Sequence, residues 1–152
     1  MIILSKLADY GVIVASHLAA DPERQVTAAV VAVETRLPRA TVAKLLKALA
    51  HGGVVTGARG VAGGYRLARP AASISVAEVV GAIDGAIGVT QCTTHGPSCQ
   101  RADFCGTKPH WQRINAAVGT ALSGMTLAEM TPGAFLARWA KAPPNSGTGA
   151  RS

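Results

Sequence analysis

Acidic residues are absent between Glu34 and Glu78, although the chain of 152 residues contains eight in total. The same stretch carries seven Lys and Arg residues, and the whole chain has a formal net charge of +7. A long stretch of one charge sign is typical of a surface that binds a polyanion. A basic face kept only for solubility is the simpler alternative, and a membrane surface is disfavoured because the cations are spread over several short elements. The cations are Arg36, Arg39, Lys44, Lys47, Arg59, Arg66 and Arg69.

Aromatic residues and long apolar runs are also scarce. The chain has only two each of Phe, Trp and Tyr, so Ala, Val and Leu must fill the core, which suits small, closely packed helices. No apolar run approaches the ~18 residues of a membrane span. The apolar start is interrupted by Lys6 and Asp9 and follows no basic region, which argues against a signal peptide. We therefore expect a cytoplasmic protein.

Helical periodicity predicts three short helices in the first third of the chain. Ser5 can cap the first helix, which ends at Asp21, and Thr27 can cap a second that runs to about Glu34. Pro38 is placed for the first turn of a third helix, which Gly52 ends. The third helix has an apolar stripe on one face and basic side chains on the opposite face. This arrangement predicts a helix-turn-helix.

A β-hairpin is expected directly after the third helix. Residues 54–56 and 65–67 are typical of two strands, and the segment between them is rich in glycine. A hairpin in this position is the wing of a winged helix. Read as a nucleotide-binding loop, the glycine-rich segment fits poorly, because no helix and no phosphate-binding lysine follow it.

The second half of the chain is expected to contain a long helix and little else that is regular. Ser75 begins a capping box for a helix to about Asp84, and a helix from Thr107 to about Ser123 carries an apolar stripe that could pack on its own domain or pair with a second copy. We favour pairing. The predicted fold is mostly α with a small β-wing, organised as a winged helix-turn-helix domain (1–84), a cysteine loop (85–106), a dimerisation helix with a short further helix (107–130) and a flexible tail (131–152). The stripe consists of Trp111, Ile114, Val118, Ala121, Leu122 and Met125.

The three cysteines, Cys92, Cys99 and Cys105, lie within fourteen positions of the predicted loop. An odd number of cysteines in a cytosolic chain disfavours a disulfide framework. Structural zinc sites usually contain closely spaced Cys pairs, which are missing here. Wider gaps suit an iron–sulfur cluster, and we favour a cluster over zinc or unliganded thiols.

These features together resemble the IscR and NsrR type of bacterial regulators, over residues 1–130. The resemblance rests on Leu4–Gly11, on Leu45–Leu49, on the wing Arg59–Pro70 and on a three-cysteine loop before a long helix. Within the family the chain looks most like regulators of the SUF iron–sulfur assembly operon, because of residues 45–50 and 110–115.

The resemblance implies a homodimer that binds a palindromic promoter site in double-stranded DNA, with a 2Fe–2S or 4Fe–4S cluster setting its affinity for DNA. By position, four residues of the third helix would face the major groove and Arg59 would enter the minor groove. Cys92, Cys99 and Cys105 would bind the cluster. The four residues are Arg39, Thr41, Lys44 and Lys47.

The fourth cluster ligand is open. IscR-type proteins place a histidine three residues after the last cysteine, where this chain has Lys108. His110 lies roughly 200° further around a helix. In the NsrR type the remaining ligand is an aspartate from the partner's first helix, and Asp9 matches that position. His95 and an exogenous ligand are the other candidates.

We therefore expect the protein to be a repressor of iron–sulfur assembly genes. A nitric-oxide- or redox-sensing repressor of the same fold and a metal-binding interaction module that does not bind DNA are the alternatives. An enzyme is not expected, because no nucleophile, base and orienting group occur together in the sequence.

Overall fold

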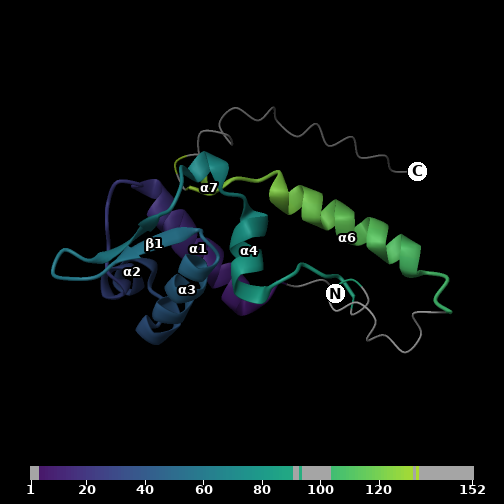
Figure 1. The fold of residues 1–152 in the computed structure, drawn as a ribbon, viewed down its shortest axis with the longest axis horizontal. Helices are drawn as coiled ribbons and strands as arrows, with labels where there is room; N and C mark the ends of the chain where they lie inside the picture. Colours follow the sequence, from purple (N-terminus) through teal and green to yellow (C-terminus); the bar gives the residue numbers. More distant parts are fainter. Residues whose placement is uncertain (1–3, 91–92, 94–103, 132, 134–152) are drawn as a thin grey trace, which may run out of the picture.

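The computed structural model describes residues 4–90, 93, 104–131 and 133. Most of this described part is helical, and its named strands form one two-stranded antiparallel sheet. Figure 1 shows a body made of the N-terminal helices, with the β-hairpin projecting at one end and the long helix α6 extending from the other. The elements are α1 (Lys6–Ala20), α2 (Ala28–Thr35), α3 (Arg39–His51), β1 (Val55–Ala58), β2 (Gly64–Leu67), the 3-10 helix η1 (Ala71–Ser73), α4 (Val76–Asp84), α6 (Lys108–Ser123) and α7 (Leu127–Met130).

Side-chain caps begin several of the helices where the sequence predicts them. Ser5 Oγ accepts a hydrogen bond from the backbone N–H of Ala8 at 3.0 Å, and Thr27 Oγ1 caps α2 in the same way. Ser75 and Glu78 form a complete capping box at α4. The backbone N–H of Ser75, followed by the Arg69 guanidinium, lowers the pKa of the Glu78 carboxyl. Each cap satisfies a backbone N–H that the helix itself leaves unpaired.

One continuous core joins α1, α3, α4 and the start of the wing. It is built almost entirely from Val, Leu, Ile and Ala, as the scarcity of aromatic residues predicts. Because these small side chains fill little space, the helices must approach one another closely to exclude water. The largest fully buried side chains are Leu46, Leu49, Ile74, Leu127, Val14, Val31, Val42, Val54 and Val79.

Two details of the helices differ from the sequence-based expectation. Pro38 lies just before α3 as its N-cap residue rather than inside its first turn. Leu7, whose spacing from Gly11 and Val14 places it on the buried face of α1, is 49% exposed, while the neighbouring Ala8 is completely buried. Ala8 shares a helix face with the buried Val12 and Ala15, so the buried face of α1 is narrower in its first turn than in the rest of the helix.

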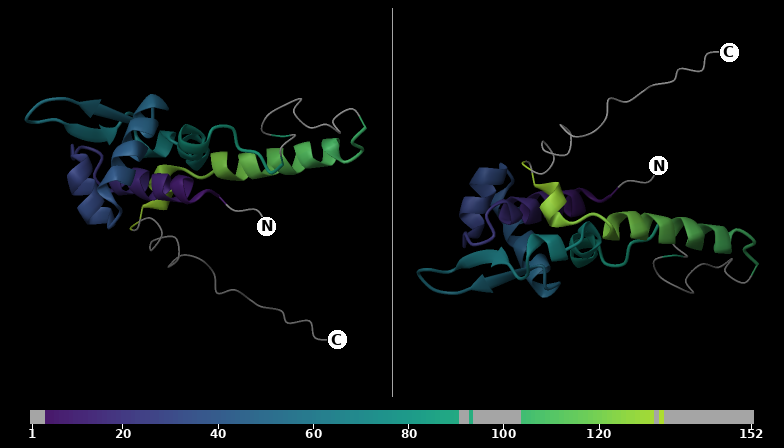
Figure 2. Two further views of the ribbon diagram at one scale, coloured as in Figure 1. Left: turned by 90° about the horizontal axis from the view of Figure 1, so that it is seen from below. Right: turned by 90° about the horizontal axis from the view of Figure 1, so that it is seen from above.

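The long helix α6 stands apart from the body in all three views (Figures 1 and 2). None of its sixteen residues is buried in this single chain. Only its C-terminal end touches the core, through the half-buried Leu122. After α6 the chain returns to the body, where the backbone N–H of Leu127 donates to Ile74 O at 2.9 Å. Among the described residues no helix is long and apolar enough to cross a membrane.

The helix α4 lies between α1 and α3 and contacts both. Glycines on each neighbour make this approach possible. A Cβ atom at Gly11 of α1 would lie 2.9 Å from Ile83 Cγ1, and one at Gly52, after α3, would lie 2.5 Å from Ala82 Cβ. Both distances are shorter than a carbon–carbon contact allows, so the spacing of the three helices depends on these glycines.

We expect Gly52→Ala to lower the free energy of unfolding by about 1–3 kcal/mol, because the new methyl group forces α3 and α4 apart. Gly81→Ala is the matched control. It lies on α4, a Cβ there would meet nothing within 4 Å, and replacing a helical glycine by alanine stabilises by up to ~1 kcal/mol. Chemical denaturation of both variants measures the difference, and equal effects would show that the α3–α4 contact is not tight.

Candidate nucleic-acid interface

Helix α3, the second helix of the predicted helix-turn-helix and therefore its recognition helix, has two distinct faces. Val42, Leu45, Leu46 and Leu49 are buried, so the side chains on the opposite side must point outward. The exposed residues of α3 are Arg39, Ala40, Ala43, Lys44, Lys47 and His51. Thr41, which the sequence places among the groove-facing residues, is half-buried at the edge of this outer face.

A concave surface of about 520 Å³ lies beside α3, and three side chains that can carry positive charge line it. Lys44 and Lys47 are joined there by His51, and the methyl groups of Ala48 and Ala82 form the rest of the lining. His51 is not among the contacts expected from the resemblance. Its spacing of four residues from Lys47 and seven from Lys44 nevertheless predicts it on the same basic face, since side chains at these spacings share one helix face. The outer face of α3 therefore offers a cluster of cations to an anionic partner.

The turn between α2 and α3 is tight and depends on Arg36. This residue has φ 57° and ψ 31° and is the only described non-glycine residue with positive φ. Its backbone N–H donates to Val33 O, and the next N–H, of Leu37, donates to Ala32 O at 3.1 Å. Arg36 thus holds a left-handed conformation that glycine adopts most readily. A left-handed arginine costs at most about 1–2 kcal/mol, and the two hydrogen bonds offset part of that cost.

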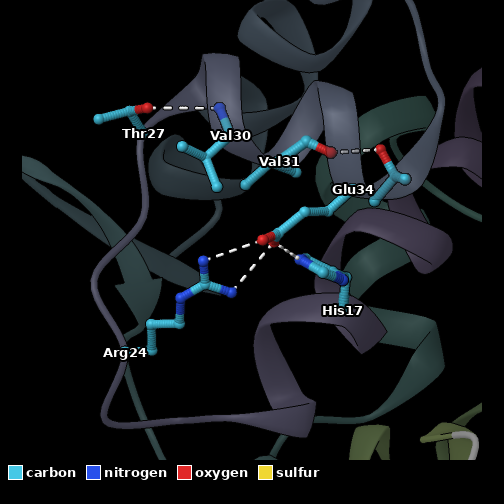
Figure 3. Close-up of polar contacts among 7 residues, drawn as sticks. His17, Arg24, Thr27, Val30, Val31 and Glu34 are labelled. Carbon is cyan, nitrogen blue, oxygen red and sulfur yellow. Dashed lines mark hydrogen bonds and ion pairs between the residues drawn. The ribbon is translucent and has the colours of Figure 1, made fainter.

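An ion-pair network fixes α2 against α1 (Figure 3). The Arg24 guanidinium donates to both carboxylate oxygens of Glu34, at 2.9 and 3.1 Å, and His17 Nε2 lies 2.8 Å from Glu34 Oε2. These contacts, with Arg24 first and His17 second, lower the pKa of the Glu34 carboxyl. A carboxyl group with a lowered pKa stabilises the fold at neutral pH, and this contribution is lost as the pH falls through its folded-state pKa. Arg24 and Glu34 thus neutralise each other where α1 and α2 meet.

The wing is a short hairpin with a tight tip. Val55 pairs with Leu67 and Ala58 with Gly64, and at the tip the N–H of Gly63 donates to Gly60 O at 2.9 Å. The wing is held to the loop before α2 by reciprocal hydrogen bonds between Val26 and Tyr65, which lies opposite Gly57 in the half of the hairpin nearer the turn.

The first residue of β2 must be glycine, and the tip of the wing presents exposed side chains. Gly64 has φ +153°, and a Cβ there would lie 2.8 Å from the backbone of Val26. Arg59 and Val61 are exposed at the tip. The hairpin projects from the helical body (Figure 1), and Arg59 lies in its turn, between the paired Ala58 and Gly64.

The expected metal site falls only partly within the described residues. Cys92, Cys99 and His95 lie outside them. Cys105 is half-buried just before α6, and its Sγ lies 3.3 Å from Thr107 Oγ1. A nearby hydroxyl and the start of a sixteen-residue helix both stabilise negative charge on sulfur, which suits a thiolate ligand.

The two candidate ligands from outside the cysteine loop are both exposed. Asp9 lies on α1 at the edge of a groove of about 400 Å³ shared with α2 and Met130, and His110 lies in the first turn of α6. Lys108, at the position where IscR-type proteins have histidine, is the first residue of α6. No group of three or more metal-ligating side chains occurs among the described residues of this single chain.

Comparison with known proteins gives consistent results over most of the chain. The Rrf2 family model, described as an iron-dependent transcriptional regulator, matches residues 4–133. The HTH-type transcriptional regulators IscR of Klebsiella pneumoniae (strain 342) and Escherichia coli (strain K12 / DH10B) are each 36% identical over 87 residues, which are 57% of this chain and 53% of the relative. The match therefore spans about half the length of these curated relatives.

Solved structures confirm the winged-helix fold. T. potens IscR superimposes with a TM-score of 0.68 at 25% identity, covering 93% of each chain. CymR (YrzC), the global cysteine regulator of B. subtilis, gives a TM-score of 0.68 at 23% identity, covering 90% of this chain and 98% of that one. The predicted mostly helical fold with a small wing is confirmed, and the matching family consists of regulators rather than enzymes. The chain belongs to the Rrf2 family of transcriptional regulators.

Proposed function

We propose that this protein is a homodimeric repressor that binds a palindromic promoter site and carries an iron–sulfur cluster, and that it controls iron–sulfur assembly genes of the SUF type. The main support for the proposal is the cationic outer face of α3. This helix belongs to a winged-helix body, and the cysteine segment follows that body in the chain. The names of the IscR relatives and the resemblance of residues 45–50 and 110–115 to SUF regulators support the choice of target. The proposed location is the cytoplasm, where promoter DNA is found.

The proposed DNA contacts follow from exposure and position. Helix-turn-helix proteins place the recognition helix in the major groove, which would bring Arg39, Lys44 and Lys47 to the DNA, with the half-buried Thr41 at the edge of the contact. Arg59 at the wing tip would lie in the adjacent minor groove, whose negative potential attracts arginine. Phosphate contacts by lysine supply affinity without sequence preference.

Lys44→Ala and Lys47→Ala should each weaken DNA binding and reduce the slope of log K against log salt by about 0.9, the value for one neutralised phosphate. Fluorescence anisotropy on a labelled promoter duplex, measured between low and physiological salt, gives both quantities. Arg113→Ala is the matched control, because it removes the same charge from α6, far from the body (Figure 1). Slopes that stay at the wild-type value would show that neither lysine contacts phosphate.

The proposed dimer interface is the part of the α6 stripe that the chain itself leaves uncovered. Trp111 is 37% exposed and Ile114 is 42% exposed. Val118 and Leu122, by contrast, are half-buried and line a groove with α4 and with Leu4 and Ser5, which precede α1. The stripe is therefore divided: its N-terminal part is open to a second copy, whereas Val118 and Leu122 face the chain's own domain. Met125, after the helix, is again 37% exposed.

Ile114→Glu should convert the dimer into a monomer, because it places a charge in an apolar interface that water cannot reach. Analytical ultracentrifugation measures the mass, and binding to a palindromic duplex should be lost in parallel. Gln112→Glu is the control, since it adds the same charge about 160° around the helix from Ile114. Leu122→Glu is less informative, because Leu122 also contacts the core of its own chain. A dimer that persists in Ile114→Glu would place the interface elsewhere.

The proposed cluster ligands are Cys92, Cys99 and Cys105 of one chain and Asp9 of the partner subunit. A bound cluster, 2Fe–2S or 4Fe–4S, would supply a group whose charge and integrity respond to iron, oxygen or nitric oxide. Asp9 is suited to this role because its exposed carboxylate lies at the edge of a groove rather than in the core. The protein's own contribution is to hold Cys105 at the start of α6 and Asp9 on α1.

Replacing any one cysteine by alanine should abolish the visible absorption of protein purified without oxygen, together with its iron and sulfide content. Asp9→Ala should still form a cluster but lose it faster in air, because a carboxylate is a harder and more weakly held ligand of iron than thiolate. The controls are His110→Ala and His95→Ala. If His110→Ala alone shortens the lifetime of the cluster, the fourth ligand is His110 and not Asp9.

A nitric-oxide- or redox-sensing repressor is the second candidate, and one observation favours it. Lys108 occupies the position of the IscR-type histidine ligand, so the ligand set proposed here is closer to that of the NsrR type. Titration of the anaerobic protein with nitric oxide, followed by DNA binding and by transcript levels of SUF genes, distinguishes the two candidates.

A further inference from the structure

In the first two turns of α3, the centre of the outer face is occupied by two alanines. Ala40 and Ala43 are exposed. At about 100° per residue, Ala40 lies opposite the buried stripe and on the same line as Lys47, two turns later. Ala43 lies between Ala40 and Arg39 around the helix. The first two turns, which enter the groove most deeply in helix-turn-helix proteins, therefore present methyl groups.

Cations of α3 flank these methyl groups, with Arg39 on one side and Lys44 on the other. Lys44, Lys47 and His51 converge on the concave surface beside α4, which neither alanine lines. This arrangement places positive charge on both sides of Ala40 and Ala43, where the phosphate backbones would lie, and leaves the two methyl groups facing the base edges.

A methyl group can neither donate nor accept a hydrogen bond. In the major groove its complementary partner is the C5-methyl group of thymine, which alanine side chains contact in other complexes. We propose that Ala40 and Ala43 recognise thymine methyl groups in the centre of each half-site. This inference rests on the proposed docking of α3 in the major groove and adds the chemical class of base that it reads.

The alternative is that the alanines only make room, so that Arg39 and Lys47 can reach guanines. The two readings differ in their dependence on a single chemical group. Deoxyuridine is thymidine without the C5-methyl group, so exchanging one for the other removes the proposed contact and leaves every hydrogen-bonding group of the base in place.

The experiment begins with selection of 30-base-pair duplexes from a random pool by the full-length protein purified without oxygen. Each thymine of the selected half-site is then replaced by deoxyuridine, and the dissociation constants are compared. At one or two positions per half-site we expect binding to weaken about fourfold, which corresponds to the ~0.8 kcal/mol of burying one carbon group.

The protein side of the contact is tested with the double variant Ala40→Gly/Ala43→Gly. Its ratio of dissociation constants for the deoxyuridine and thymidine duplexes should fall to about one at those positions. Because both constants come from the same variant, any loss of helix stability cancels in the ratio. Lys44→Gln is the control, and it should weaken binding to both duplexes while leaving the ratio near four.

The outcomes separate this inference from the proposed function. The wild-type protein could select a defined sequence and yet bind the deoxyuridine and thymidine duplexes equally at every thymine. That result overturns the inference and leaves DNA recognition intact. A ratio near four that persists in the double glycine variant assigns the methyl contact to other residues and also overturns it. A protein that enriches no sequence from the pool overturns the inference and the proposed function together.

Discussion

Burial of the apolar stripe of α3 is the constraint on which the rest of the structure depends. Leu46 and Leu49 are completely buried among α1, α2 and α4, and this fixes the rotation of α3 about its own axis. A rotation of even one residue position would turn the cations by about 100° and move them away from any groove. The apolar core therefore sets the geometry of the charged surface, although no core side chain is itself charged.

Two of the cations that are not on the outer face are neutralised by ion pairs within the fold. Arg24 is paired with Glu34, and Arg69 with Glu78 at 2.6 Å. Exposed pairs of this kind contribute little to stability. Their effect on the potential is more important, because they leave Lys44, Lys47 and Arg59, which have no resolved ion pair among the described residues, as the source of a positive field on the recognition side.

Much of this architecture could be predicted from the sequence, because it is specified locally. Ser5, Thr27 and Ser75 mark the starts of their helices through short-range hydrogen bonds, and the glycines around the wing mark its turn. What could not be predicted depends on contacts between distant segments. The exposure of Leu7 and the partial burial of Thr41 follow from how far neighbouring helices extend, which no periodicity encodes.

The same distinction between local features and contacts of distant segments applies to the candidate site. Positions on one helix, such as Lys44, Lys47 and the additional His51, follow from spacing alone. The division of the α6 stripe does not, because it depends on where Leu122 meets the core of the body. The ligand set proposed for the cluster depends on a second chain and on Cys92 and Cys99, which lie outside the described residues, so spacing could indicate only candidates.

The close approach of α4 to its neighbours has a mechanical consequence. Its last turn, at Ala82 and Ile83, touches Gly52 on one side and Gly11 on the other with no spare space, and residues 85–90 lead directly from it to the cysteine segment. A tightly packed interior transmits displacement instead of absorbing it. A small displacement at the C-terminal end of α4 would therefore be passed on to α1 and α3.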